Sequence, residues 1–193
     1  MPSSMCGMFL RLTRSSRALT CLPTSGEVRT ARSPSAKSSH EILSGVSADS
    51  FDFWLGTWDV SWGGEGGQVE AGVNSVTRVD DTIRELFTAP DPAGAYIGAS
   101  VSRWDADAEC WRQDYWDNRG YSAIFQGSRS ADRMILERIP GPGPGPLTRL
   151  VWSDIAPAAI LWNYERQNAD GSWESTWRIG YARQETGGAS ATL

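Results

Sequence analysis

Apolar and polar residues alternate from Thr57 to Trp62, the first regular stretch of the chain. Alternation is the period of a β-strand that buries one face. The inward face is predicted to carry the large residues Trp58, Val60 and Trp62. We therefore interpret this stretch as the first strand of a β-barrel, with Trp58 inside and Asp59 outside.

A helical turn is predicted directly before that strand. The segment from Ser50 to Leu55 is long enough for one turn, and Asp49 is placed to act as its N-cap. Gly56 can end the turn, because glycine adopts backbone angles that other residues avoid. The chain is therefore expected to enter its first strand through a short helix.

The alternating pattern continues to Arg183, interrupted by turns rich in Gly, Pro, Asn and Asp. The predicted strands are 57–62, 68–79, 82–88, 95–104, 110–116, 121–126, 133–139, 147–154, 159–167 and 173–183. We therefore predict that residues 45–185 form an all-β domain, a single closed or nearly closed antiparallel barrel of about ten strands.

The second strand does not alternate cleanly. Val69, Ala71 and Val73 share one face, but Val76 falls out of phase with them. A β-bulge inserts one residue and shifts the phase in this way, and barrels use bulges to bend their strands. We expect a bulge near Asn74 and Ser75.

The third strand carries Ile83, Glu85 and Phe87 on one face, so neither face is purely apolar. A wall around a partly polar cavity and an exposed edge strand would both produce this pattern. Inside a barrel, Glu85 would have a pKa raised toward neutrality and could act as a general acid or base. We favour the alternative, in which Glu85 faces solvent and pairs with an arginine; Asp114 is a weaker catalytic candidate.

Later strands carry a face of aromatic residues interrupted by single polar groups. If this face points inward, it lines an apolar pocket suited to a small planar or lipophilic ligand. The predicted ligand-binding residues are Trp62, Trp111, Gln113, Tyr115, Tyr121, Phe125, Trp162 and Tyr164. The alternative is that the rings simply fill the barrel, although ten strands leave more interior space than eight.

These residues carry a resemblance to known families. The entry through Gly56 and Trp58 resembles that of the calycins, the lipocalins and their relatives. The segment 53–58, Phe-Trp-Leu-Gly-Thr-Trp, more closely resembles DUF1579, a bacterial family of unknown function with a lipocalin-like or nitrobindin-like barrel. Further similar segments are 111–113, 117–120, 150–153 and 170–173, so the resemblance spans about 51–183. It implies a fold and no activity.

The same resemblance implies how the barrel closes. In calycins, an arginine of the last strand packs across the tryptophan of the first. The matching residue is predicted to be Arg178, stacked on Trp58, with Arg183 as a second candidate. Both are expected to have a structural role.

Composition places the chain among soluble globular proteins. It has 193 residues, of which 40% are hydrophobic and 21% charged, and no apolar run approaches the roughly 20 residues of a membrane span. All ten tryptophans lie between Trp54 and Trp177, so one domain buries them. We expect a cytoplasmic protein with no membrane span.

Charge is divided unevenly along the chain, whose net charge is −5. Residues 1–44 are basic and rich in Ser and Arg, and residues 186–193 show no pattern, so both are predicted to be disordered. The first segment is either a non-structural extension, including one caused by a wrongly assigned start, or a targeting segment. The acidic remainder argues against nucleic acid as a partner.

Histidine chemistry is excluded from the predicted barrel, because the sole histidine is His40. A Ser/His/Asp or Cys/His catalytic group and a zinc site built on histidine therefore cannot form there. Nitrobindin-like barrels hold haem through a histidine, and this chain departs from them at that point. We expect no metal and no cofactor.

Three functions are compatible with these patterns. The first is non-covalent binding of a small, apolar or amphipathic molecule inside the barrel. The second is a cofactor-independent isomerase, cyclase or hydratase that uses Glu85. The third is a structural or interaction module with a filled core. The sequence also allows a homodimer.

Overall fold

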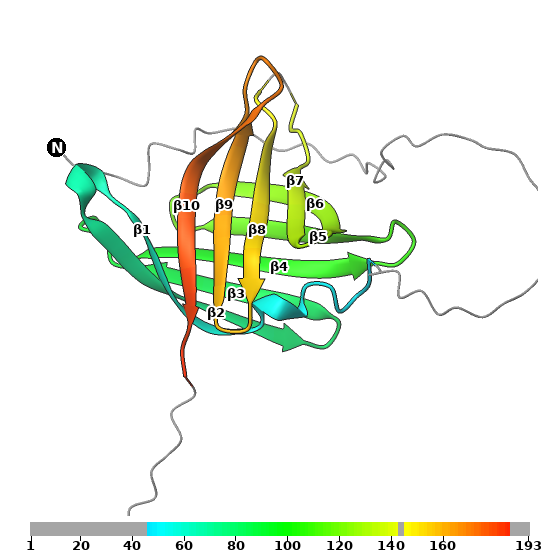
Figure 1. The fold of residues 1–193 in the computed structure, drawn as a ribbon, viewed down its shortest axis with the longest axis horizontal. Helices are drawn as coiled ribbons and strands as arrows, with labels where there is room; N and C mark the ends of the chain where they lie inside the picture. The colour runs from blue at the N-terminus through cyan, green and yellow to red at the C-terminus, as the bar shows by residue number, and fades with distance from the viewer. Residues whose placement is uncertain (1–45, 143–144, 186–193) are drawn as a thin grey trace, which may run out of the picture.

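The computed structural model describes residues 46–142 and 145–185, so the predicted extensions 1–44 and 186–193 lie outside it. The described residues form a closed antiparallel β-barrel of ten strands (Figure 1), as the alternating pattern predicts. Two short 3-10 helices, η2 (Asp52–Trp54) and η3 (Glu65–Gly67), flank the first strand. No helix in these two ranges is long and apolar enough to cross a membrane.

Each strand pairs with its neighbours in sequence, and β1 pairs with β10 to close the sheet. The strands are β1 (Gly56–Gly63), β2 (Val69–Val79), β3 (Thr82–Ala89), β4 (Tyr96–Asp105), β5 (Cys110–Asp117), β6 (Ser122–Ser130), β7 (Arg133–Arg138), β8 (Thr148–Ala156), β9 (Ala159–Gln167) and β10 (Trp173–Arg183). In Figure 1, β8 to β10 cross in front of β3 to β5 at a steep angle, so the interior lies between two differently oriented walls.

The predicted bulge in β2 is wrong. The register of β2 with both β1 and β3 runs without a shift past Asn74. Val69 and Ala71 are exposed on the outer face, whereas Asn74 and Val76 are buried on the inner face. Val76 is therefore in phase with a partly polar inner face, and the shifts in register occur elsewhere, between Ser175 and Trp177 and between Ser153 and Ala156.

A cluster of aromatic rings plugs the end of the barrel where β1 begins. Phe51 and Trp54, beside and within η2, stack with ring centroids 5.1 Å apart. Trp152 of β8 meets Phe51 edge-on at 5.0 Å. The helical turn is shorter than expected, and Asp49 does not cap it, because η2 begins after Phe51 with no side-chain cap.

Arg183, the second candidate, makes the closing contact in place of Arg178. Its guanidinium lies 4.0 Å from the centroid of the Trp58 ring. It also donates hydrogen bonds from Nε to the Pro157 carbonyl at 2.5 Å and from Nη1 to the Leu55 carbonyl at 2.7 Å. Cation–π attraction and hydrogen bonds from a charged donor therefore join the strand seam to the plug.

The alternation of side chains along β10 explains why Arg178 cannot make the closing contact. Ile179 and Tyr181 of β10 are buried on the inner face, and Arg183 continues that face two residues on. Arg178 lies on the opposite face, is exposed, and donates from Nε to Asn163 Oδ1 at 3.0 Å. Register also places Arg183 directly opposite Trp58.

Gly56 leaves the space that Arg183 occupies. Its φ of 133° suits glycine, and a Cβ at this position would collide with Arg183 Nη1. The glycine and tryptophan of the entry motif are therefore both explained by one arginine: Gly56 lets the guanidinium pass, and Trp58 supplies the ring on which it stacks.

We predict that Arg183→Ala lowers the free energy of unfolding by about 2 to 4 kcal/mol, because it removes the stacking on Trp58 and the charged hydrogen bonds to the Leu55 and Pro157 carbonyls. Arg178→Ala is the matched control and should cost under about 1 kcal/mol, since that side chain is exposed. Urea denaturation of both variants measures the difference. Equal losses of stability would contradict the assignment.

Candidate functional site

The barrel interior contains a cavity. Its volume, counted as the space that the centre of a water molecule can reach, is about 50 Å³. On the same measure, one water needs roughly 10 to 15 Å³. Its lining comes from η2 and from β3, β4, β5, β6, β8, β9 and β10, together with Tyr121 just before β6. The barrel is therefore not completely filled by its aromatic rings, and the remaining space suits a small molecule.

Most of the residues predicted to bind a ligand do line this cavity. They are Gln113, Tyr115, Tyr121, Phe125, Trp162 and Tyr164. Other lining residues not singled out by the sequence include Leu150, Trp152, Trp177 and Ile179. These lie on β8 and β10, where the same alternation could have identified them.

Trp62 and Trp111 are predicted site residues that are not among the cavity-lining residues. Trp62 packs against Phe87 and Trp177, which do line it. Trp111 is fully buried, and its Nε1 donates to Ser50 Oγ at 3.1 Å. Both face inward as expected, but Trp111 packs at the plug, 5.4 Å from the Phe51 ring.

One wall of the cavity is aromatic and comes mainly from β8 to β10. Trp162 and Trp177 lie nearly perpendicular, with centroids 5.5 Å apart, and Trp152 completes this wall from β8. Trp152 Nε1 is buried without a hydrogen-bond partner. This wall offers aromatic surface and one unsatisfied donor.

The opposite wall, from β3 to β5, carries polar groups, and the expectation that Glu85 faces solvent is wrong. Glu85 lies between the buried residues Ile83 and Phe87 and lines the cavity. β3 is paired on both sides, so it is not an exposed edge. Glu85 is only half-buried as a residue, because part of its side chain borders the cavity.

Both carboxylate oxygens of Glu85 accept a hydrogen bond. Asn74 Nδ2 donates to Oε1 at 2.9 Å, and Ser100 Oγ donates to Oε2 at 2.6 Å. Asn74 Nδ2 also donates to the Tyr181 hydroxyl at 3.0 Å. Asn74, Ser100 and Tyr181 were missed in the sequence. The expected bulge obscured the orientation of Asn74. On a strand without a bulge, Asn74 shares the inner face with Val76.

Burial raises the pKa of Glu85 to about 7, against the opposing effect of the hydrogen bonds from Ser100 and Asn74. Removal from bulk water destabilises the ionised carboxylate more than two neutral donors stabilise it. Glu85 therefore changes charge near neutral pH, which is where a general acid or base is most effective.

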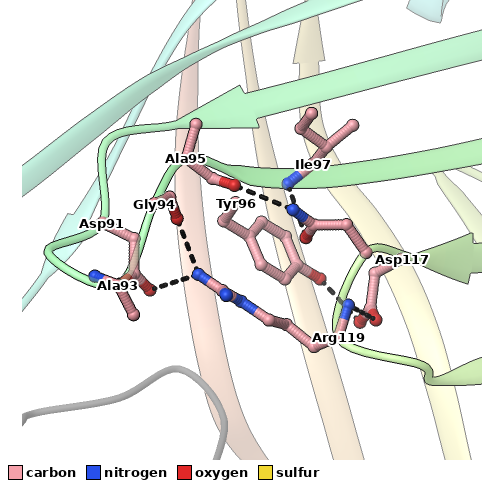
Figure 2. A network of polar contacts seen from close by, with 9 residues as sticks. Asp91, Ala93, Gly94, Ala95, Tyr96, Ile97, Asp117 and Arg119 are labelled. Atoms are coloured by element: carbon pink, nitrogen blue, oxygen red, sulfur yellow. Dashed lines mark hydrogen bonds and ion pairs between the residues drawn. The ribbon is translucent and has the colours of Figure 1, made fainter.

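A chain of hydroxyl groups reaches from the cavity to Asp117, at the barrel end opposite the plug. The Tyr96 hydroxyl lies 2.6 Å from that of Tyr115 and donates to Asp117 Oδ2 at 3.1 Å; Figure 2 shows the step from Tyr96 to Asp117. Since Tyr96 has one hydroxyl proton and gives it to Asp117, Tyr115 must donate to Tyr96. The Tyr115 oxygen therefore keeps an acceptor site.

Arg119 joins two turns at that same end (Figure 2). Its Nη2 donates to the Gly94 carbonyl at 2.7 Å and lies 3.4 Å from Asp91 Oδ2. Its backbone N–H donates to Asp117 Oδ1 at 2.8 Å. The turn between β5 and β6 is thereby tied to the loop between β3 and β4, and it holds Asp117 in place for Tyr96.

Burial raises the pKa of four tyrosines in this interior above their usual range: Tyr96, Tyr115, Tyr121 and Tyr181. The charge of Glu85 adds to the increase for Tyr96, Tyr115 and Tyr181. All four therefore keep their protons at neutral pH. In the described chain, no three His, Cys, Asp or Glu residues are grouped as metal ligands would be.

Fold and site together define a ten-stranded β-barrel with an interior cavity that is aromatic on one side and polar on the other. No family model matches the chain, and no curated protein matches it in sequence.

Among solved structures, the chain is similar to "a redesigned beta barrel, mFAP0, bound to DFHBI", with 16% identity over 68% of this chain and 99% of that one and a TM-score of 0.37. It is also similar to "EF1p2_mFAP2b bound to DFHBI", with 14% identity over 71% of this chain and 98% of that one and a TM-score of 0.38. Likeness at this level says nothing about what this chain binds.

The raised pKa of Glu85 predicts a distinct pH dependence of stability. The folded protein holds the Glu85 proton up to about pH 7, whereas the unfolded chain releases it near 4.5. The contribution of Glu85 to the free energy of unfolding is therefore complete below about pH 4.5. It falls as the pH rises toward 7 and is lost above that pH, which lowers the stability by about 3 kcal/mol.

Glu85→Gln should remove that loss, so the variant should be more stable than the wild type at pH 8 and gain little at pH 5. Glu65→Gln, at an exposed position, is the control and should follow the wild type. Urea melts across this pH range measure the effect. Parallel curves for the wild type and Glu85→Gln would show that Glu85 titrates normally.

Proposed function

We propose that this protein binds a small, mostly apolar molecule inside its barrel. The observation that carries the proposal is the cavity itself, in which aromatic rings from β8 to β10 stand opposite hydrogen-bonding groups from β3 to β5. Ligand sites commonly combine an apolar lining with a few polar groups that fix orientation. A fully packed interior, as in a purely structural module, would leave no such space.

The size of the cavity limits the ligand. The cavity has room for a few water molecules, which is about the volume of a compound with one or two rings. Long fatty acids, retinoids and porphyrins would require the walls to move apart. Gln113 supports a polar contact: it is buried, faces the cavity, and donates from Nε2 to Ser102 Oγ at 3.1 Å.

The proposal includes membership of a DUF1579-like family with a calycin barrel. The support is local: segment 53–58 resembles that family, and in this barrel it supplies the plug, the glycine and the stacking ring of the closing contact. A cytoplasmic location and a homodimer stay predictions.

Neutral one-ring compounds test the binding proposal. p-Cresol, benzyl alcohol and toluene should bind the full chain and change its tryptophan emission, because Trp152, Trp162 and Trp177 border the cavity. Ile179→Phe places a larger side chain in the cavity and should weaken binding about tenfold or more, equal to about 1.4 kcal/mol.

Ile97→Phe is the matched control, since Ile97 is 41% exposed, and its affinity should equal that of the wild type. Calorimetry supplies a second measurement. An interior that binds none of the three compounds, or equal binding by both variants, would refute the proposal.

A second candidate function is proton transfer by Glu85. The observation that favours it is a cavity-lining carboxyl group whose pKa is about 7, with the un-ionised Tyr115 on the same wall. A base of this pKa can remove a proton next to a carbonyl, and a tyrosine hydroxyl can donate a hydrogen bond to the oxygen that gains charge. Enolisable ketones are the matching substrate class.

Exchange of carbon-bound hydrogen in D₂O measures this activity. 4-Phenyl-2-butanone at pH 7 should exchange faster with the wild type than in buffer, as followed by NMR. Glu85→Gln should reduce the enzymatic rate about 100-fold or more. An unchanged rate in that variant would exclude Glu85 as the base.

A further inference from the structure

The cavity lining contains an acidic residue but no basic one. Of the described residues that line it, Glu85 is the only one that ionises near neutral pH, and none is Lys, Arg or His. Arg183 faces inward at the plug, but its guanidinium is held by Trp58 and by backbone carbonyls. The ionised Glu85 therefore has neutral hydrogen-bond donors as partners and no cation among the lining residues.

Glu85 can accept more hydrogen bonds than the protein gives it. Each carboxylate oxygen has two lone pairs, and the structure gives one donor to each: Asn74 to Oε1 and Ser100 to Oε2. The side chain borders the cavity, so a ligand can supply further donors. Tyr115, on the same wall, offers a hydroxyl oxygen that can also accept.

The wall of β8 to β10 carries no charged group. Trp152, Trp162 and Trp177 give it an aromatic surface against which the apolar part of an amine can pack. An anionic ligand would be buried beside Glu85 without a basic partner. The charge of the lining therefore favours a cationic ligand over an anionic one.

We propose that the cavity is a site for a small organic cation, an aromatic or alkyl amine whose ammonium group binds Glu85 while its apolar part packs among Trp152, Trp162 and Trp177. This inference rests on the proposed binding function and specifies its ligand class. The ammonium group has three N–H donors, enough for both Glu85 oxygens and the Tyr115 hydroxyl. Binding moves no covalent bond and needs no cofactor.

Such binding is linked to pH through Glu85. The titratable groups that face it are Tyr96 on β4, Tyr115 on β5 and Tyr181 on β10, and all stay protonated near neutral pH. An ammonium group binds the ionised carboxylate, so affinity should reach a plateau above about pH 7 and fall about tenfold for each pH unit well below it. A neutral ligand should not show this loss.

Three probes of similar shape test the charge preference: 2-phenylethylamine, 2-phenylethanol and 3-phenylpropanoate, titrated into the full chain at pH 8. The amine should bind at least tenfold more tightly than the alcohol, and the carboxylate more weakly than either. Glu85→Gln should weaken amine binding at least tenfold and remove the preference for the amine over the alcohol. Glu65→Gln, at an exposed site, should match the wild type.

The wild-type pH profile keeps the inference testable if Glu85→Gln fails to fold. Amine affinity that rises from pH 5 to 8 while alcohol affinity does not supports the site. Equal affinity for the amine and the alcohol at pH 8, or tighter binding of the carboxylate, overturns the organic-cation site and leaves the binding function standing. Failure of all three probes and of the neutral one-ring compounds overturns both.

Discussion

The contact between Arg183 and Trp58 is the constraint on which this barrel depends. A closed sheet has no free edges, but it must join its first and last strands, which are far apart in sequence. Arg183 lies directly opposite Trp58 at that seam and also binds the carbonyl of Leu55 next to the plug. One side chain therefore fixes the register of the seam and the position of the rings that cover one end, while Gly56 leaves it room.

Closure in turn determines what the interior can contain. Ten strands leave space that side chains do not fill completely, and the crossing of β8 to β10 over β3 to β5 places two unlike walls face to face. The polar wall is kept in order by bonds within itself: Ser100 and Asn74 orient Glu85, and Asp117 orients Tyr96. These bonds hold polar groups in fixed directions beside an apolar space, as selective recognition requires.

Much of this structure was predictable from period-2 alternation. The ten strands, the inward Trp58 and the face of Gln113 and Tyr115 all follow from it. Two predictions were wrong because they departed from this alternation. A bulge was expected at Asn74, where the strand is regular. Arg178 was preferred for the closing contact, although Arg183 lies on the same face of β10 as Tyr181. The division between plug and cavity, which separates Trp111 from Gln113, depends on how η2 packs and could not be read from one strand.

The buried carboxyl group of Glu85 also affects how this protein would respond to engineering. Selection for heat resistance favours substitutions that remove a desolvated charge, and Glu85 is such a charge above pH 7. A search guided by melting temperature at alkaline pH would therefore replace it early. The resulting barrel would have a higher melting temperature, but its cavity would lose the one lining group that changes charge near neutral pH. Here stability and recognition make opposite demands on a single residue.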